Sequence, residues 1–283
     1  MWRRERLRHS VARIKNRKIR RPLQKGLLFY KTDCDEAVAD GRDIWYTVGM
    51  NVYAISDLHL SGMCDKPMDI FGTGWEGYWE RICADWRKKV APDDIVLIAG
   101  DISWAMRLDQ AMYDLHRIGD LPGYKVILRG NHDYWWESVS KLRARLPQGM
   151  YAVQNDCVRI DNYLICGSRL WAMPIRPSDE DVKMQGREYL RLEMSLRGAK
   201  AMRGEGDVVI AMCHYPPFDV TANANRYTDL FEKYGVSKVV YGHLHGKDCR
   251  VMHKRTIGRV EYYLTSCDLV GYELVHIDAS SEA

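Results

Sequence analysis

Five short polar segments supply the residue types that hydrolysis with two metal ions needs. Each segment ends an apolar run that is typical of a buried strand, such as 51–56, 94–99 or 238–241. The segments are Asp57-Leu58-His59, Gly100-Asp101, Gly130-Asn131-His132-Asp133, His214-Tyr215 and Gly242-His243-Leu244-His245. Because α/β sheets gather their ligands at the carboxyl ends of strands, the five segments together predict a single site.

The spacing of the aspartates and histidines fits metal ligation. Residues i and i+2 of an extended segment face the same way. Asp57 and His59 can therefore hold one ion together, and so can His243 and His245. Asp101 follows a strand and a glycine, and its two carboxylate oxygens allow it to bridge two ions.

Two further donors complete the predicted ligand set. Asn131 adds an amide oxygen, and His214 adds an imidazole nitrogen. Nitrogen and oxygen donors without thiolate suit Mn²⁺, iron, Zn²⁺, Co²⁺ or Ni²⁺. The positive charge of two divalent ions exceeds the negative charge of two aspartates. The site should therefore attract anionic oxygens and lower the pKa of a bridging water. We therefore expect a dinuclear centre at which a metal-bridging hydroxide hydrolyses phosphate esters.

The third segment also supplies the predicted catalytic residues, His132 and Asp133. A tight turn would point His132 away from the ion that Asn131 binds. His132 can instead face the oxygen of the leaving group and donate a proton to it. Asp133 can hold the other ring nitrogen of His132 and fix its tautomer.

These motifs in this order resemble the calcineurin-like metallophosphoesterase superfamily, whose pattern is D-x-H, GD, GNH[DE], H and GHxH. The resemblance covers roughly residues 50–278 and is closest to compact bacterial members with no known substrate. It implies an α/β fold, a four-layer α-β-β-α sandwich of two mainly mixed β-sheets flanked by helices. It implies that His132 is the catalytic histidine and that Asp101 bridges the two metals. The other implied ligands are Asp57, His59 and His245 for the first metal, and Asn131, His214 and His243 for the second.

The chain departs from one branch of this superfamily. Protein Ser/Thr phosphatases continue the second motif as GD-x-x-D-R-G, with an arginine that clamps phosphate. The corresponding segment here, 100–106, has no arginine, which disfavours a phosphoprotein phosphatase. Arg129 lies at a strand end, where it can point away from the site. Arg169 lies at a loop edge where it could meet a substrate phosphate, although a solvated surface arginine is the simpler interpretation.

Four tryptophans lie beside the motif segments: Trp104, Trp135, Trp136 and Trp171. Tryptophans in such places are usually half-buried packing residues, and the alternative is that one of them stacks on a base or sugar of the substrate. Residues 172–203 are the longest insertion between motifs, and we expect substrate specificity to reside there.

From residue 51 onward the apolar periodicity alternates between strands and helices, which favours an α/β fold with a layered sheet core. Further strands are expected at 163–166, 259–265 and 270–278. Helices are expected at 74–89, 108–118, 137–146, 179–203 and 226–234.

Residues 1–49 differ from the predicted metallophosphoesterase domain, 50–283. Residues 1–25 hold eleven Lys and Arg and one Glu, whereas the rest of the chain is net negative, although the whole chain carries +4. The segment could be a basic arm that contacts nucleic acid, a helix packed on the domain, or a poorly ordered or non-essential extension ahead of Met50. We favour the last, because the folded pattern needs nothing before residue 50. Nucleic acid is therefore a possible partner through residues 1–25 but not the favoured one.

The remaining sequence signals narrow the function class. No apolar run approaches the ~20 residues of a membrane span, and no secretory signal is recognisable. The eight cysteines form no C-x-x-C pair, which indicates free thiols and a cytoplasmic protein. No P-loop, dinucleotide-binding turn or serine-hydrolase elbow is present.

We therefore predict a metal-dependent enzyme that hydrolyses a phosphodiester or a small phosphomonoester. The alternatives are a catalytically silent metal-binding scaffold and a nuclease-type member aided by the basic N-terminal arm. The sequence makes no prediction of oligomeric state.

Overall fold

The computed structural model describes residues 29–30, 46–47, 49–218, 223–246 and 249–277. The chain divides into two units, Met1–Gly49 and Met50–Ala283, and each is described by itself. In the first unit, β1 (Phe29–Tyr30) pairs antiparallel with β2 (Tyr46–Thr47). Residues 1–25 lie outside the described residues, as does most of 26–49. The predictions of a non-essential extension and of nucleic-acid contact therefore stay predictions.

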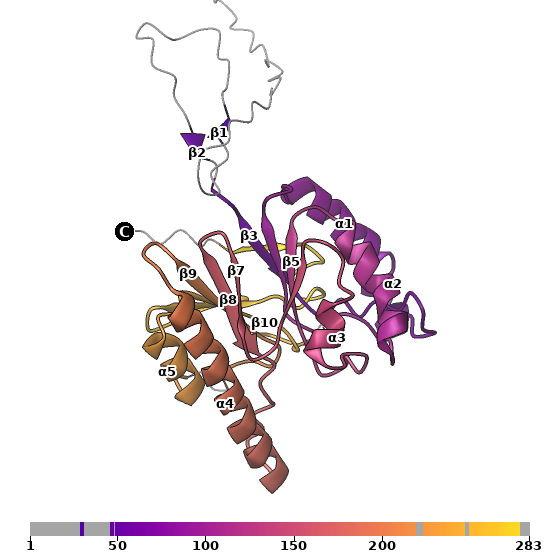
Figure 1. Cartoon of the computed structure of the whole chain (residues 1–283). Helices are drawn as coiled ribbons and strands as arrows, with labels where there is room; N and C mark the ends of the chain where they lie inside the picture. The colour runs from indigo at the N-terminus through magenta and orange to yellow at the C-terminus, as the bar shows by residue number, and fades with distance from the viewer. Residues whose placement is uncertain (1–28, 31–45, 48, 219–222, 247–248, 278–283) are drawn as a thin grey trace, which may run out of the picture. The chain divides into compact units, whose positions relative to one another are not determined.

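The second unit contains two mixed β-sheets (Figure 1). The five-stranded sheet has the order β13-β3-β4-β5-β6, with β13 antiparallel to β3 and the other neighbours parallel. Its strands are β3 (Val52–Ile55), β4 (Ile95–Ile98), β5 (Tyr124–Leu128), β6 (Met150–Val153) and β13 (Val275–Ile277).

The six-stranded sheet has the order β11-β12-β10-β9-β8-β7. Its four central strands run parallel, and both edge strands are antiparallel to their neighbours. Its strands are β7 (Cys157–Ile160), β8 (Tyr163–Ser168), β9 (Val208–Cys213), β10 (Lys238–Tyr241), β11 (Lys254–Ile257) and β12 (Val260–Leu264).

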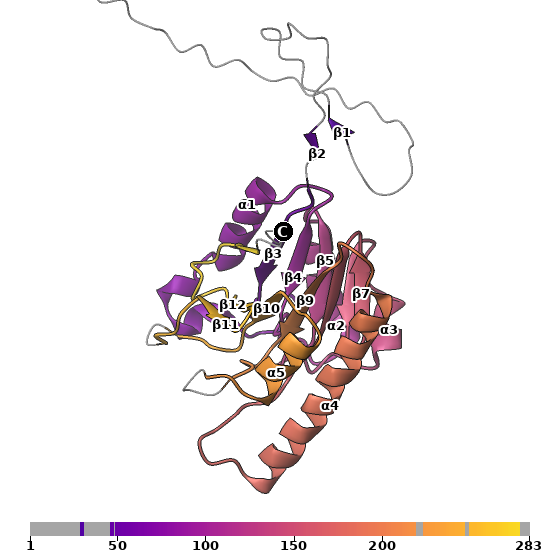
Figure 2. The same cartoon turned by 90° about the vertical axis from the view of Figure 1, so that its left-hand side faces the viewer.

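Helices cover the outer face of each sheet (Figures 1 and 2). The five-stranded sheet is covered by α1 (Tyr78–Lys89), α2 (Leu108–Gly119) and α3 (Val139–Arg143). The six-stranded sheet is covered by α4 (Asp179–Met202) and α5 (Arg226–Lys233). Among the described residues, no helix has the length and apolarity required to cross a membrane.

The burial of β4 shows how the layers arise from the sequence. Side chains of a strand alternate between its two faces, and a sheet covered on both faces needs apolar residues at every position. Ile95 and Leu97 lie in the core between the two sheets, whereas Val96 and Ile98 lie in the core beneath the helices. A third core lies between the six-stranded sheet and α4 and α5. The predicted four-layer α-β-β-α sandwich is therefore confirmed.

Several predicted element bounds need correction. The helix expected from residue 74 begins at Tyr78, because η1 (Met68–Phe71) and η2 (Thr73–Trp75) form short 3₁₀ turns before it. The helix expected at 137–146 is shorter, and it starts where the Ser138 side chain accepts a hydrogen bond from the backbone N–H of Lys141. Strands β6, β7 and β11 were not predicted; all three lie at sheet edges.

The two sheets are joined at the carboxyl ends of β3 and β12. A parallel bridge links Ser56 to Ser266. The backbone N–H of Ser56 donates to the carbonyl oxygen of Thr265 at 2.8 Å, and the N–H of Cys267 donates to the carbonyl oxygen of Ser56 at 3.1 Å. Asp57 follows this junction directly, so residues from both sheets can meet around it.

Candidate metal centre

The predicted ligands lie on sharp backbone turns at the strand ends. Four of them adopt the left-handed conformation, with φ values of 59° at Asp57, 45° at His59, 50° at Asp101 and 71° at His243. This conformation is uncommon for residues other than glycine, and it persists where the surrounding structure enforces it. Its occurrence in four predicted ligands supports the prediction that the site lies at this end of the sandwich.

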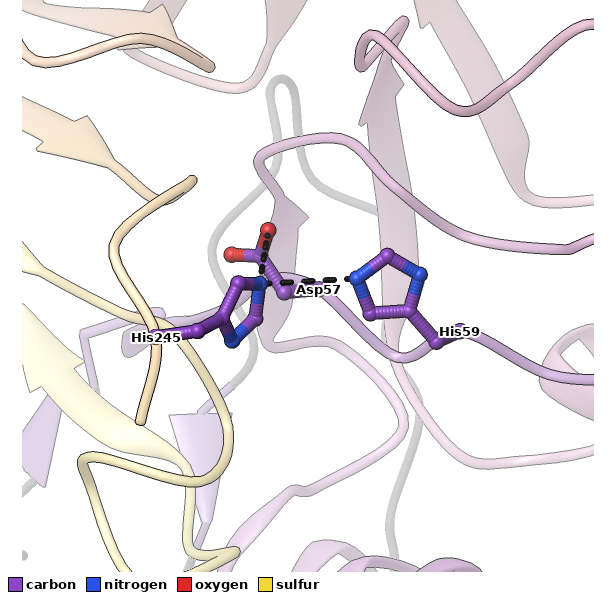
Figure 3. A group of neighbouring side chains, drawn as sticks. All are labelled: Asp57, His59 and His245. Carbon is purple, nitrogen blue, oxygen red and sulfur yellow. Dashed lines mark hydrogen bonds and ion pairs between the residues drawn. The ribbon is translucent and has the colours of Figure 1, made fainter. Parts of the chain in front are cut away.

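A first group of donor atoms is formed by Asp57, His59 and His245 (Figure 3). The ligand atoms of these three residues all lie within 4.8 Å of one another. Nε2 of His245 lies 3.1 Å from Oδ1 of Asp57 and 3.4 Å from Nε2 of His59. This spacing fits three ligands that converge on one cation, and the donors are the nitrogen and oxygen atoms expected from the sequence.

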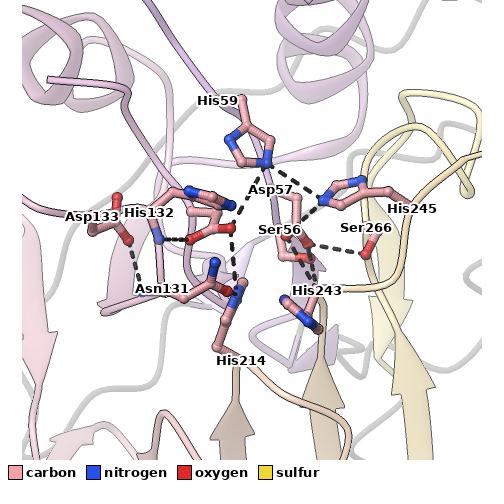
Figure 4. A network of polar contacts seen from close by, with 12 residues as sticks. Ser56, Asp57, His59, Asn131, His132, Asp133, His214, His243, His245 and Ser266 are labelled. Carbon is pink, nitrogen blue, oxygen red and sulfur yellow. Dashed lines mark hydrogen bonds and ion pairs between the residues drawn. The ribbon is translucent and has the colours of Figure 1, made fainter. Parts of the chain in front are cut away.

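A second group is formed by Asp57, Asp101 and His214, again with ligand atoms within 4.8 Å of one another. Nε2 of His214 lies 3.4 Å from Oδ2 of Asp101 and 2.6 Å from Oδ1 of Asn131. The same Asp101 oxygen lies 3.8 Å from Nε2 of His59. Figure 4 shows the labelled side chains of His59, Asn131 and His214 pointing toward one another. Asp101 therefore connects the two groups, as a bridging carboxylate would, and Asp57 belongs to both.

His243 lies beside the second group but is not part of either close group. Its backbone N–H donates to both carboxylate oxygens of Asp57, at 3.2 and 3.1 Å. Its ring centroid lies 5.2 Å from that of His214 and 4.1 Å from that of Tyr215. Metal ligation by His243 therefore stays a prediction.

Asp57 is oriented by two serines that the sequence motifs do not include. The hydroxyls of Ser56 and Ser266 donate to Oδ2 of Asp57, at 2.5 and 3.0 Å. This leaves Oδ1 toward His245. Burial raises the pKa of Asp57, but the hydrogen bond with His245 and the charge of that ring oppose it, and the pKa falls well below its usual range. The carboxyl is thus held ionised, as a metal ligand must be.

The protonation of the histidines is set by burial and by carboxylates. Burial lowers the pKa of His59 and of His243 to about 4 each, so both rings are neutral at neutral pH. Burial also lowers the pKa of His245, but hydrogen bonds with Asp268 and Asp57 raise it to about 10. Nδ1 of His214 lies 3.0 Å from the carbonyl oxygen of Ala99, which leaves Nε2 directed at the site.

Asp268 contacts the predicted ligand His245, and the sequence motifs do not include it. Its Oδ1 accepts a hydrogen bond from Nδ1 of His245 at 2.9 Å, and its Oδ2 accepts one from the N–H of Gly246 at 2.9 Å. A carboxylate behind a ligating histidine fixes the ring orientation and increases its basicity. The sequence feature that could have identified it is the position of this aspartate, shortly after the strand expected at 259–265.

We expect Asp268→Ala to weaken metal binding about 10–100-fold, because it removes the partner that orients His245. Metal affinity can be measured by competition with a chromophoric chelator. Glu273→Ala is the matched control, since the Glu273 side chain is 66% exposed and pairs with Lys89. Equal metal affinities for the two variants would contradict the role of Asp268.

His132 lies beside the first ligand group. Its backbone N–H donates to Oδ1 of Asp101 at 2.8 Å. Its ring centroid lies 5.6 Å from that of His59 and 4.7 Å from that of Trp104. The ring is thus close to the centre without belonging to either close ligand group, as expected for a group that handles a proton.

Asp133 does not hold the His132 ring, in contrast to the prediction. Its carboxylate accepts hydrogen bonds from the backbone N–H groups of Gly130, Ile102 and Ser103 and from the indole of Trp135. Within the described part of the chain, the His132 imidazole is not among its partners. The side chain is fully buried, and the tight turn directs it into the loop behind the ligands. Asp133 therefore ties the second motif to the third.

Two motif glycines leave room for the ligand carboxylates. A Cβ atom on Gly130 would lie 2.0 Å from Oδ1 of Asp101. A Cβ atom on Gly242 would lie 2.3 Å from Oδ2 of Asp57 and from Oγ of Ser56. Both separations are far shorter than van der Waals contact, so any larger side chain must displace a ligand.

We expect Gly242→Ala to cost about 1–3 kcal/mol of stability and to weaken metal binding, because it forces Asp57 out of position. Gly186→Ala is the matched control. Nothing lies within 4 Å of a Cβ at Gly186 in α4, and the change should stabilise the protein by up to about 1 kcal/mol. Denaturant unfolding and metal titration of both variants check this, and undiminished metal affinity in Gly242→Ala would refute it.

The tryptophans beside the motifs have different roles. Trp104 stacks on His59 with ring centroids 4.6 Å apart. Trp135 and Trp136 are only 0% and 3% exposed, so stacking on a substrate is excluded for both. The indole N–H of Trp171 donates to Asp181 at 2.9 Å. Trp104 and Trp171 are half-buried and remain the two candidates for substrate contact.

Comparison with known proteins bears on the family and the fold of the chain. A model of the calcineurin-like phosphoesterase family matches residues 50–247. A search of curated proteins found no match. Among solved structures, the protein TT1561 of Thermus thermophilus aligns with a TM-score of 0.52 and 12% identity, over 82% of this chain and 99% of that chain. This likeness shows a shared fold.

Two other solved structures align with lower TM-scores. The protein of unknown function AQ665 from Aquifex aeolicus gives a TM-score of 0.43 and 18% identity, over 81% of this chain and 96% of that chain. The phosphopantetheinyl hydrolase PptH from Mycobacterium tuberculosis gives 0.48 and 13%, over 82% and 97%. The family match rests on more than half of this sequence and includes all five motif segments; the chain belongs to the calcineurin-like phosphoesterase family.

Proposed function

We propose that this protein hydrolyses phosphate esters at a centre of two divalent metal ions. The observation that carries the proposal is the pair of ligand groups that meet at shared carboxylates. Asp57 belongs to both groups, and one oxygen of Asp101 lies between His59 and His214. A single-ion site has no need of such a shared arrangement.

The donor chemistry fits two hard or borderline cations. In this proposal Asp57, His59, Asp101 and His245 hold the first ion, and Asp101, Asn131, His214 and His243 hold the second. All are oxygen or nitrogen donors, a set that suits Mn²⁺, iron, Zn²⁺, Co²⁺ or Ni²⁺. When bound, the two ions supply a nucleophile at neutral pH and the Lewis acidity that stabilises charge on the phosphoryl oxygens.

The residues of the chain orient the ligands and handle the leaving-group proton. Ser56 and Ser266 fix the Asp57 carboxylate, and Asp268 fixes the His245 ring. His132 is held by its backbone N–H on Asp101, with its ring beside His59. From this place its imidazole donates a proton to the departing oxygen, the usual role of a general acid.

The test compares a diester with a monoester. Metal-stripped protein is refilled with Mn²⁺, and hydrolysis of bis-p-nitrophenyl phosphate and of p-nitrophenyl phosphate is measured, with Asp101→Ala as the blank. We expect turnover of at least one of the two above the blank, and the preferred ester identifies the substrate class. No turnover of either by the metal-loaded protein would contradict the proposal and favour a metal-binding scaffold.

A further inference from the structure

We propose that Arg129 and Arg169 bind a second anionic group of the substrate, next to the Asn131 and His214 side of the metal centre. This inference rests on the proposed function and narrows its substrate class. The substrate is then a phosphate ester that carries a further phosphate or carboxylate.

The two arginines extend from the backbone segments that position Asn131 and His214. Arg129 follows β5 directly and precedes Asn131 by two residues. Arg169 follows β8, and its carbonyl oxygen accepts hydrogen bonds from the N–H groups of His214 and Tyr215, at 3.2 and 3.0 Å. Oδ1 of Asn131 and Nε2 of His214 are only 2.6 Å apart. The backbone of Arg129 therefore lies on the Asn131 side of this ligand pair, and the backbone of Arg169 lies on its His214 side.

The charge of Arg169 acts on Arg129, as expected for two arginines that flank the same ligand pair. Burial lowers the pKa of Arg129, and the positive charge of Arg169 lowers it further. Tyr215 packs on His243, with ring centroids 4.1 Å apart. Because the N–H of Tyr215 donates to the carbonyl oxygen of Arg169, the backbone of this arginine lies beside the residue that packs on His243.

The nearby carboxylates are already occupied by other donors. Glu188 is buried, and it accepts hydrogen bonds from Arg191 at 2.6 Å and from the Ser168 hydroxyl at 2.5 Å. The Asp133 carboxylate is occupied by the four N–H donors described above. The charges of both carboxylates act on Arg129 and raise its pKa, but their hydrogen bonds come from these other donors and not from the two arginines.

Arg129 shows the need for a partner most clearly. Its Nε atom is buried and has no hydrogen-bond partner among the described residues. A buried donor on a charged group that lacks a partner is costly, and native structures normally satisfy it. Arg169 is half-buried, with its guanidinium carbon 5.3 Å from the centroid of the Trp171 ring, which limits its orientations.

The chemistry of the pair identifies the ligand class. Guanidinium groups present a planar fork of N–H donors that matches the oxygens of phosphate or carboxylate. The metal ions that the ligands would hold bind the phosphoryl group that reacts, so an anion at the arginines belongs to another part of the substrate. A substrate with one phosphate and an otherwise neutral body would leave Arg129 unsatisfied.

The test is calorimetric titration of the Mn²⁺-loaded protein with three ligands that are not hydrolysed. Propylphosphonate has one anionic group, propane-1,3-diphosphonate has a second phosphonate, and 3-phosphonopropionate has a carboxylate instead. We expect the second group to tighten binding about 10–100-fold in the unmodified protein, as charged hydrogen bonds do. The ligand with the larger gain identifies the second group as phosphate or carboxylate.

Variants of Arg169 test whether this side chain supplies the gain in affinity from the second anionic group. Arg169→Met should reduce it to about 3-fold or less, and Arg169→Lys should keep only part of it, because lysine retains the charge but lacks the fork. Arg176→Met is the matched control, since Arg176 is exposed and should leave the gain unchanged. The inference is overturned if the unmodified protein shows no gain, or if Arg169→Met keeps it.

The outcome is independent of turnover, because calorimetry needs none. If the second anionic group tightens binding as expected but the protein hydrolyses no ester, only the proposed function is contradicted. Turnover of bis-p-nitrophenyl phosphate without any gain would contradict this inference alone.

Discussion

Asp101→Ala should lose bound metal and reduce kcat/KM by about 10³-fold or more. One oxygen of Asp101 lies 3.4 Å from Nε2 of His214 and 3.8 Å from Nε2 of His59, so the variant removes the carboxylate that connects the two groups. Metal ions supply several kcal/mol of stabilisation to a phosphoryl-transfer transition state, and each 1.36 kcal/mol is a factor of ten in rate. Metal content by mass spectrometry and kcat/KM on an aryl phosphate give the two readouts.

Two further variants make the Asp101 result interpretable. Asp101→Asn keeps the shape of the side chain and an acceptor for the N–H of His132, but it removes the negative charge. It should lose nearly as much metal as the alanine variant, because a neutral amide is a weak bridge between cations. Asp109→Ala is the control for the substitution itself, since that side chain is 81% exposed. Full metal content in Asp101→Ala would rule out the shared-carboxylate centre.

His132→Ala should retain its metal and lose about 10²–10⁴-fold in kcat, the usual contribution of general acid–base catalysis. Alanine keeps the backbone N–H that donates to Asp101, so the ligand geometry survives the substitution. The loss should be larger for esters with poor leaving groups, since p-nitrophenolate departs readily without a proton. A series of aryl and alkyl phosphates of rising leaving-group pKa measures this dependence.

The exposed His116 supplies the control, and His116→Ala should leave both metal and kcat unchanged. If His132→Ala loses activity equally on all leaving groups, His132 does not act as the general acid. If it loses metal as well, His132 belongs to the ligand set instead.

The central strands and the clustering of the candidate ligands were predictable because both leave strong local signals. The whole of β4 is buried on both faces, so its sequence is a continuous apolar run. The polar residues that follow such runs stand out, and parallel strands bring their carboxyl ends to one edge. Asp57, His59, Asp101, His214 and His245 could therefore be placed in one site from the sequence.

The edge strands and the supporting residues left no comparable signal. In β11 no residue is fully buried, because this strand lies at the edge of its sheet. Asp268 and Ser266 act through contacts with residues more than twenty positions away in the sequence. Asp133 was assigned to the wrong partner, because the direction of a side chain in a tight turn depends on backbone angles that the motif does not specify.

The measurement that tests the central claim most directly is the activity of metal-free protein as Mn²⁺ is added in known equivalents. With bis-p-nitrophenyl phosphate and p-nitrophenyl phosphate as substrates, activity should rise until two equivalents per chain are bound and then level off. Activity that saturates at one bound equivalent, or protein that binds two equivalents and hydrolyses neither ester, would contradict a dinuclear phosphoesterase.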